Sequence, residues 1–145
     1  MKHQCHQGHG AEWKGDVPTG TGTFTAGDTI GGGYTYKPRF EDGAGSNPEQ
    51  LVAAAHAACL SMGLANIFAE AGTTAESVRT EATLTLRLVD GTPSITTVGL
   101  TTVAKVPGLE EASFVEHANT AKAGCPVSRA LAALPEITLE ASLAP

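Results

Sequence analysis

The chain has 145 residues, 41% of them hydrophobic, and a formal net charge of −6. A chain of this length and apolar content can bury a core without disulfide bonds. Nine Lys and Arg residues against fifteen Asp and Glu make no basic patch, which excludes nucleic acid as an expected partner.

The first ten residues are polar and contain His3, Cys5, His6 and His9. We expect residues 1–10 to form a flexible arm and residues 11–145 to form a single domain. No basic segment precedes an apolar run here, so we expect a cytoplasmic protein rather than a secreted one. The four side chains could ligate a soft divalent ion. Because no second C-x-x-C or H-x-x-x-H half accompanies them, we predict no metal site, and metal handling by the arm stays a weaker alternative.

Short runs rich in Thr and Gly follow, at 13–17, 22–26 and 33–37, and predict a small antiparallel meander. The three glycines at 31–33 could cradle a phosphate, but no helix-forming sequence follows them. A turn is therefore the favoured interpretation of these glycines.

A long apolar helix is predicted next. Ser46 or Asn47 suits an N-cap, Pro48 suits the first helical position, and Gly72 suits a left-handed stop after about residue 71. The run is interrupted by polar residues and begins at a cap, so we expect a core helix and not a membrane span. It is apolar nearly all round, and a lone monomer of this size rarely surrounds such a helix. The pattern therefore favours a homodimer.

Strict alternation of apolar and polar residues over 78–88 predicts a half-buried strand. A turn at 90–93 returns the chain as a partner strand over 95–106. Two helices follow, at 110–123 and from 126 to about 134, and alternation over 137–143 predicts a closing strand. This order predicts an α+β fold: an antiparallel sheet packed on a long buried central helix plus two shorter helices.

Two cysteines carry the chemistry that the sequence suggests. Cys59 lies about three turns into the long helix, beyond the reach of the helix dipole, and apolar burial raises a thiol pKa above its usual value of about 8.5. Either a positive group activates Cys59 or it is an inert core residue. Cys125 begins a helix, where free backbone N–H groups favour a thiolate, and we expect it to be partly exposed.

Arg39 and Glu49 are the candidates to activate Cys59. Arg39 lies just before the long helix, between Pro38 and Phe40, and Glu49 lies in the first turn of that helix. If Glu49 held the guanidinium against Cys59, Arg39 would lower the thiol pKa and bind the oxygens of a peroxide. Each could also be an ordinary surface charge. His56 shares a helix face with Cys59 and is either a packed, hydrogen-bonded residue or a proton shuttle.

Two segments, 47–51 (NPEQL) leading into 57–59 (AAC), and 121–128 (AKAGCPVS), resemble the two signatures of the OsmC/Ohr family of osmotically inducible and organic hydroperoxide resistance proteins. The resemblance runs from about residue 11 to residue 143. The sequences around Trp13, Arg39 and His56 are more similar to the OsmC branch than to the Ohr branch.

The resemblance implies a thiol peroxidase built as an intertwined homodimer. In that family Cys59 would be the peroxidatic cysteine, Cys125 the resolving one, Arg39 the activator and Glu49 the residue that orients Arg39. The substrates would be organic hydroperoxides and, more weakly, hydrogen peroxide. A dithiol donor, in the family a lipoylated protein, would reset the disulfide without a metal, flavin or haem cofactor. The alternative is a redox-sensing or ligand-binding module of the same fold, with no efficient turnover.

Overall fold

The computed structural model describes residues 10–41 and 45–145. Two compact units make up the chain, Met1–Pro48 and Glu49–Pro145. Residues 1–9 of the predicted flexible arm lie outside the described residues, so the arm stays a prediction. A single domain from 11 to 145 likewise stays a prediction.

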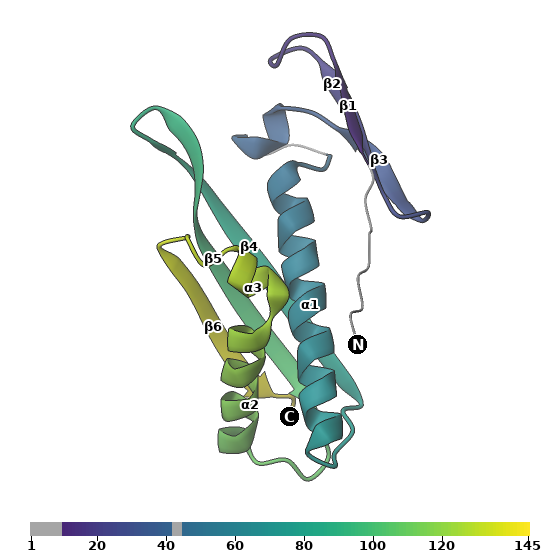
Figure 1. Cartoon of the computed structure of the whole chain (residues 1–145), viewed down its shortest axis with the longest axis vertical. Helices are drawn as coiled ribbons and strands as arrows, with labels where there is room; N and C mark the ends of the chain where they lie inside the picture. The colour runs from purple at the N-terminus through teal and green to yellow at the C-terminus, as the bar shows by residue number, and fades with distance from the viewer. Residues whose placement is uncertain (1–9, 42–44) are drawn as a thin grey trace, which may run out of the picture. The chain divides into compact units, whose positions relative to one another are not determined.

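The first unit contains the predicted meander. Strands β1 (Ala11–Lys14), β2 (Thr21–Ala26) and β3 (Ile30–Tyr34) pair antiparallel in chain order, and the 3-10 helix η1 (Lys37–Arg39) follows them (Figure 1). The predicted strand bounds were wrong at both ends of the meander. β1 ends at Lys14 because Gly15 takes a φ of +91° and the Asp16 carboxylate accepts a hydrogen bond from Thr19 N at 2.9 Å. The predicted turn at 31–33 is also wrong, since these glycines lie in β3.

Gly22 allows the aromatic residues of the meander to pack. It pairs with Trp13 on one side and with Tyr34 on the other, and the two rings lie 5.5 Å apart between centroids. A Cβ atom at Gly22 would lie 2.5 Å from the Tyr34 ring, which no real contact allows. The position therefore requires glycine.

Helix α1 (Pro48–Glu70) opens the second unit and matches the predicted helix closely. It ends in a Schellman motif: Gly72 takes a φ of +79°, and Thr73 N donates to Phe68 O at 2.8 Å. An 18-residue window of α1 has a mean hydropathy of 1.7, so by length and composition the helix could cross a membrane. Core helices meet the same criteria, and α1 packs one face into a core.

The sheet of the second unit is mixed rather than antiparallel. β4 (Ser77–Val89) and β5 (Thr92–Lys105) form the predicted antiparallel hairpin, whose turn has positive φ at Asp90 and Gly91. β6 (Glu136–Leu143) pairs with β5 in parallel. The helical crossover between β5 and β6 returns the chain to the end of the sheet where β5 begins. β6 therefore runs in the same direction as β5.

That crossover contains helices α2 (Glu111–Gly124) and α3 (Pro126–Ala130). The third helix is shorter than predicted. After Ala130 the chain continues in turns to Leu134, which precedes Pro135 and is therefore disfavoured in a helical conformation.

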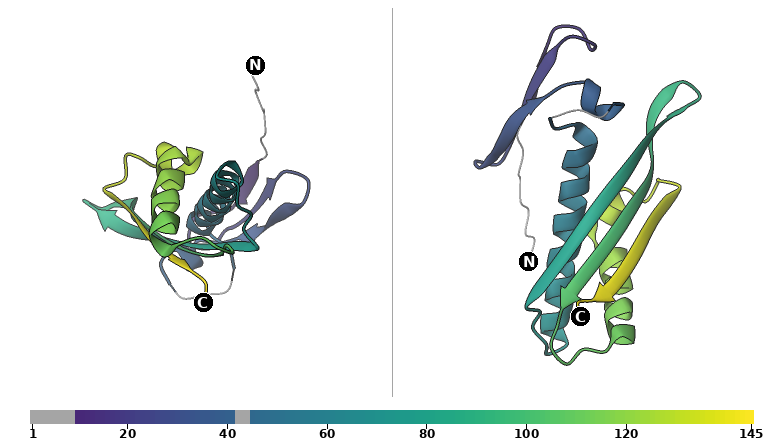
Figure 2. Two further views of the ribbon diagram at one scale, coloured as in Figure 1. Left: turned by 90° about the horizontal axis from the view of Figure 1, so that it is seen from below. Right: turned by 180° about the vertical axis from the view of Figure 1, so that it is seen from behind.

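The helices of the second unit lie on one face of its sheet (Figure 2). Between helices and sheet lies a buried core of Leu60, Leu64, Phe68, Val98, Leu100, Ala104, Val106, Phe114, Ala118 and Ala121. The stacked rings of Phe68 and Phe114, 5.9 Å apart, fix α1 against α2. The fold is α+β, as predicted.

Candidate active site

The two cysteines meet where α1 passes the break between α2 and α3. Cys59 Sγ lies 3.1 Å from Cys125 Sγ although 66 positions separate the residues, and both thiols are free. α1 contributes Cys59 next to its buried face, and Cys125 is the extended residue between α2 and α3. The break predicted between the helices at 110–123 and from 126 therefore places Cys125 against α1. The separation is short enough that an oxidant could convert the two thiols to a disulfide after a small approach of the sulfurs.

The surroundings shift the two thiol pKa values in opposite directions. Burial raises the pKa of Cys59, and the hydrogen bond with Cys125 raises it further, against a smaller lowering by Val127 N–H. Burial also acts to raise the pKa of Cys125, but hydrogen bonds from Ser128 N–H, the Cys59 thiol, the Ser128 hydroxyl and Val127 N–H outweigh it. The pKa of Cys125 is lowered as a result. Cys125 is thus the better thiolate of the pair.

The expected exposure of Cys125 was wrong. Its side chain is buried, at 4% exposure, whereas Cys59 is half-buried. The turn from α2 into α3 points the Cys125 sulfur towards α1 instead of solvent. Its thiolate is favoured by hydrogen-bond donors, not by contact with water.

Glu49 and Arg39 belong to different units of the chain. Glu49 is buried in the first turn of α1, at 9% exposure. Arg39 ends η1 and lines a pocket of about 150 Å³ in the first unit, together with Trp13, Val17, Tyr34, Thr35, Tyr36 and Pro48. Its guanidinium carbon lies 5.8 Å from the centre of the Phe40 ring. The predicted contacts of Arg39 with Cys59 and Glu49 stay predictions.

A second pair of side chains flanks the cysteines, and the sequence did not predict it. His56 Nε2 lies 2.6 Å from Ser128 Oγ, and both residues are buried. His56 is packed and hydrogen-bonded, as favoured from the sequence. The available signal was spacing: His56 lies three residues before Cys59 and Ser128 three residues after Cys125, so each shares a helix face with a cysteine.

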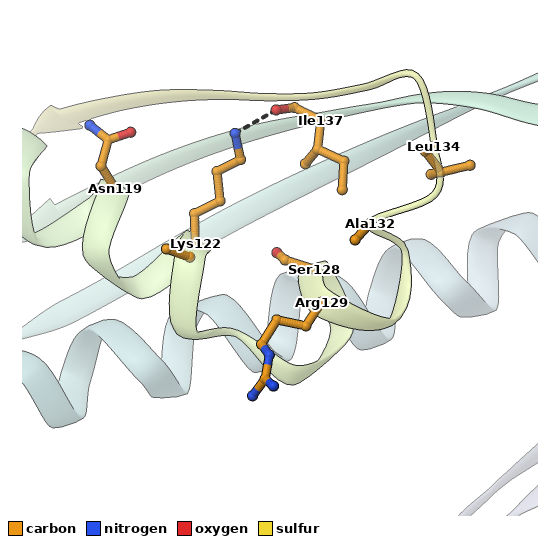
Figure 3. Close-up of a pocket in the computed structure, with 8 residues that line it drawn as sticks. Asn119, Lys122, Ser128, Arg129, Ala132, Leu134 and Ile137 are labelled. Carbon is orange, nitrogen blue, oxygen red and sulfur yellow. Dashed lines mark hydrogen bonds between the residues drawn. The ribbon is translucent and has the colours of Figure 1, made fainter.

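Ser128 also lines a cavity of about 490 Å³ beside α2, α3 and β6, drawn in Figure 3. Lys122 Nζ donates to Ile137 O at 2.5 Å across this cavity, while the Arg129 guanidinium points away from it.

In the part of the chain that the structure describes, no group of three or more His, Cys, Asp and Glu side chains could hold a metal ion. The N-terminal cluster of His3, Cys5, His6 and His9 lies outside the described residues. The alternative of metal handling by the arm is therefore not tested by the structure.

Known proteins match both the sequence and the fold. The sequence pattern of OsmC-like proteins matches residues 41–140. Peroxiredoxin OsmC of Escherichia coli strain K12 is 42% identical over 140 residues, which cover 95% of this chain and 96% of that protein. An OsmC organic hydroperoxide resistance protein of Legionella pneumophila shares the fold at 21% identity, with a TM-score of 0.72 over 96% of this chain and 99% of that one. An OsmC-like protein of Mycoplasma pneumoniae does so at 18% identity, with a TM-score of 0.76 over 99% and 100%. The chain belongs to the OsmC/Ohr family.

Proposed function

We propose that the protein is a thiol-dependent peroxidase that reduces organic hydroperoxides, and hydrogen peroxide more weakly, with Cys59 as the attacking thiol and Cys125 as the resolving thiol. The observation that carries the proposal is the 3.1 Å separation of the two sulfurs, both free, in a fold that brings residues 66 positions apart together. The name of the E. coli relative, a peroxiredoxin, supports the same class of reaction.

The reaction has three balanced steps. The Cys59 thiolate attacks the outer peroxide oxygen, the O–O bond breaks, and the alkoxide takes a proton and leaves as an alcohol. Cys59 is then a sulfenic acid. The Cys125 sulfur attacks it, and the hydroxide lost from sulfur takes a proton and leaves as water, which protects Cys59 from over-oxidation. A dithiol reduces the Cys59–Cys125 disulfide by exchange and becomes a disulfide itself.

Arg39 and Glu49 complete the proposed site. Burial and the hydrogen bond with Cys125 raise the pKa of Cys59, so a positive partner would favour the attacking thiolate. Arg39 offers a guanidinium beside an aromatic pocket that suits the organic part of a hydroperoxide. Glu49, a buried carboxylate at the start of α1, would orient that guanidinium, within one chain or across a dimer interface.

We further propose that the active form is a homodimer. Along α1 a stripe of exposed apolar residues recurs at intervals of three and four, and Met62 within it is 75% exposed. The stripe consists of Leu51, Ala54, Ala55, Ala58, Met62, Ala65 and Ala69. Met62→Lys is expected to turn a dimer into a monomer in analytical ultracentrifugation. Monomeric wild-type protein at micromolar concentration would rule out the dimer.

The electron donor and the cellular location complete the proposal. The donor would be a dithiol, with a lipoylated protein as the candidate, because a second thiol in the donor resolves the mixed disulfide within one molecule. We place the protein in the cytoplasm, where such donors keep thiols reduced, with no membrane or nucleic acid as partner.

Stopped-flow consumption of cumene hydroperoxide by the reduced protein tests the proposal. The wild type should consume peroxide far faster than free cysteine does and should cycle repeatedly with a dithiol. Cys125→Ser should consume one equivalent and then stop, while the matched Cys5→Ser variant should cycle normally. Rates equal to those of free cysteine would refute the peroxidase, and a Cys125→Ser variant that cycles normally would refute the resolving role.

One observation favours a second candidate, a redox sensor of the same fold. The raised pKa of Cys59 would make its oxidation slow, as a sensor tolerates and a peroxidase does not. A sensor would form the same disulfide, but stoichiometrically and without fast turnover, so the stopped-flow experiment separates the two candidates.

A further inference from the structure

The cysteine pair extends into a chain of buried hydrogen bonds that the proposed reaction leaves unused. His56 Nε2 on α1 lies 2.6 Å from Ser128 Oγ on α3. The Ser128 hydroxyl hydrogen-bonds the Cys125 sulfur, which lies 3.1 Å from the Cys59 sulfur. Four side chains from two helices and the break before α3 therefore form one connected line that ends on the reacting sulfurs.

The direction of the hydrogen bonds follows from the state of His56. The imidazole is fully buried, and burial together with the positive charge of Lys122 on α2 lowers its pKa, so it is neutral and carries one ring proton. Its Nδ1 has no hydrogen-bond partner among the residues that the structure describes. A proton on Nδ1 would leave a buried N–H unpaired and would turn the Ser128 hydroxyl towards His56. A proton on Nε2 is donated to Ser128 Oγ, and the Ser128 hydrogen is then donated to Cys125. The second arrangement makes one more hydrogen bond and is the stable one.

The same geometry argues against a serine hydrolase. A nucleophilic serine must donate its proton to the histidine, and a third group must orient that histidine from its other nitrogen. Among the described residues His56 Nδ1 has no such group, and Ser128 is only 7% exposed. The pair therefore serves the neighbouring sulfur and not an acyl substrate.

We propose that Ser128 is a further catalytic residue of the cysteine pair, whose hydroxyl donates to the Cys125 sulfur and stabilises its thiolate, and that His56 is the positioning residue that holds this hydroxyl in the donating orientation. The proposal rests on the peroxidase function proposed above, because it names what governs the resolving half of that cycle.

The Ser128 hydroxyl should have its largest effect on the rate at which a donor reduces the Cys59–Cys125 disulfide. A donor thiolate attacks Cys59 Sγ, a new S–S bond forms to Cys59, and the Cys59–Cys125 bond breaks with its electron pair leaving on Cys125. A stabilised thiolate is the better leaving group, so Ser128 speeds this step. It also directs the attack to Cys59, the half-buried sulfur, and away from the buried Cys125. The second donor thiol then displaces Cys59, and the two donor protons end on the two cysteines.

Three ionisable groups act on this centre and must be separated in a test: Cys59 and His56 on α1, and Lys122 on α2. A Cys5→Ser, Cys59→Ala background leaves Cys125 as the single cysteine and removes the first group. The rate of alkylation by iodoacetamide against pH then gives the pKa of Cys125 directly.

In this background Ser128→Ala should raise the Cys125 pKa by about one to two units, the effect of one lost hydrogen bond to a charged group. Ser128→Thr keeps the hydroxyl and should restore the pKa, and His56→Phe, which cannot donate, should raise it in the same direction. Ser61→Ala is the matched control, because Ser61 Oγ on α1 donates to Thr80 Oγ1 at 2.9 Å, and this variant should leave the pKa unchanged. An unchanged pKa in Ser128→Ala, or equal increases in Ser128→Ala and Ser128→Thr, would overturn the proposal.

With both cysteines present, the disulfide of Ser128→Ala should react with dithiothreitol about tenfold more slowly than the wild-type disulfide at neutral pH. Disulfide reduction at the wild-type rate would contradict the catalytic role. The outcome for the peroxidase itself is separate: slow first-equivalent consumption by the wild type refutes that function, whereas the alkylation experiment judges Ser128 without any peroxide.

Discussion

Replacing His56 with Gln should remove one defined component of the pH dependence of folding. His56 is fully buried, and its Nδ1 has no hydrogen-bond partner among the described residues. Its pKa is lowered from the ordinary value near 6.5 by burial and then by Lys122. Between the lowered folded value and 6.5, the unfolded chain binds a proton that the folded chain does not. The free energy of unfolding therefore falls as pH falls through this window, and His56 contributes no pH dependence above it.

The contribution of His56 to the slope of the unfolding free energy against pH has an upper limit. One proton bound only by the unfolded chain gives a slope of about 1.4 kcal/mol per pH unit. Urea denaturation followed by circular dichroism, from about pH 8 down to about pH 5, should show this slope below pH 6.5 in the wild type. Subtracting the curve of His56→Gln cancels the contributions of the other titrating groups and should isolate it.

His117→Gln is the matched control. His117 lies on α2 and packs its ring edge-on against Phe68 at 5.9 Å. This variant retains His56, so it should retain the slope that His56→Gln loses. Parallel curves for the wild type and His56→Gln would refute the reasoning, since His56 would then be protonated equally in the folded and unfolded chains.

Three further predictions concern packing and charge. Gly22→Ala should lower the stability of the meander by at least about 1–3 kcal/mol, because the new methyl group would overlap the Tyr34 ring, and the fluorescence of Trp13, the chain's single tryptophan, should report it during urea unfolding. Leu64→Ala empties a fully buried position and should cost about 2–5 kcal/mol in the same assay followed by circular dichroism, whereas Leu64→Met should cost less than about 1.5 kcal/mol. Arg39→Met should slow consumption of cumene hydroperoxide about 10- to 100-fold in stopped flow, the value of one lost charged hydrogen bond, and an unchanged rate would remove Arg39 from the site.

Local signals in the sequence predicted the elements well. Pro48 and Gly72 marked the ends of α1, and Asp90 with Gly91 marked the hairpin turn. Proline suits the first helical turn, and Gly72, Asp90 and Gly91 take a positive φ that few residues adopt. Boundaries failed where a side chain decided them, as at Asp16, whose carboxylate forms a turn and ends β1 early.

Long-range relations were harder to predict. The parallel pairing of β6 with β5 depends on the path of a crossover, and the alternation of residues in a strand is the same for either direction. The contact of Cys59 with Cys125 was foreseen from a family resemblance and not from periodicity. The contact of His56 with Ser128, across 72 positions, was missed because the spacing of three places each residue beside its own cysteine but does not pair the two residues with each other.

The opposed pKa shifts of the two sulfurs bear on how the site is divided along the chain. In the second unit Cys125 has backbone N–H donors, the Ser128 hydroxyl and the Cys59 thiol to stabilise a negative charge on its sulfur. The same unit leaves Cys59 with a raised pKa, because burial and Cys125 both oppose its ionisation. With these pKa values alone, a donor would reduce the Cys59–Cys125 disulfide readily, because Cys125 is a good leaving group. Cys59 would attack peroxide slowly, because little of it would be thiolate. A cation beside Cys59 would offset both effects, and the Arg39→Met variant tests whether Arg39, at the end of η1, supplies it.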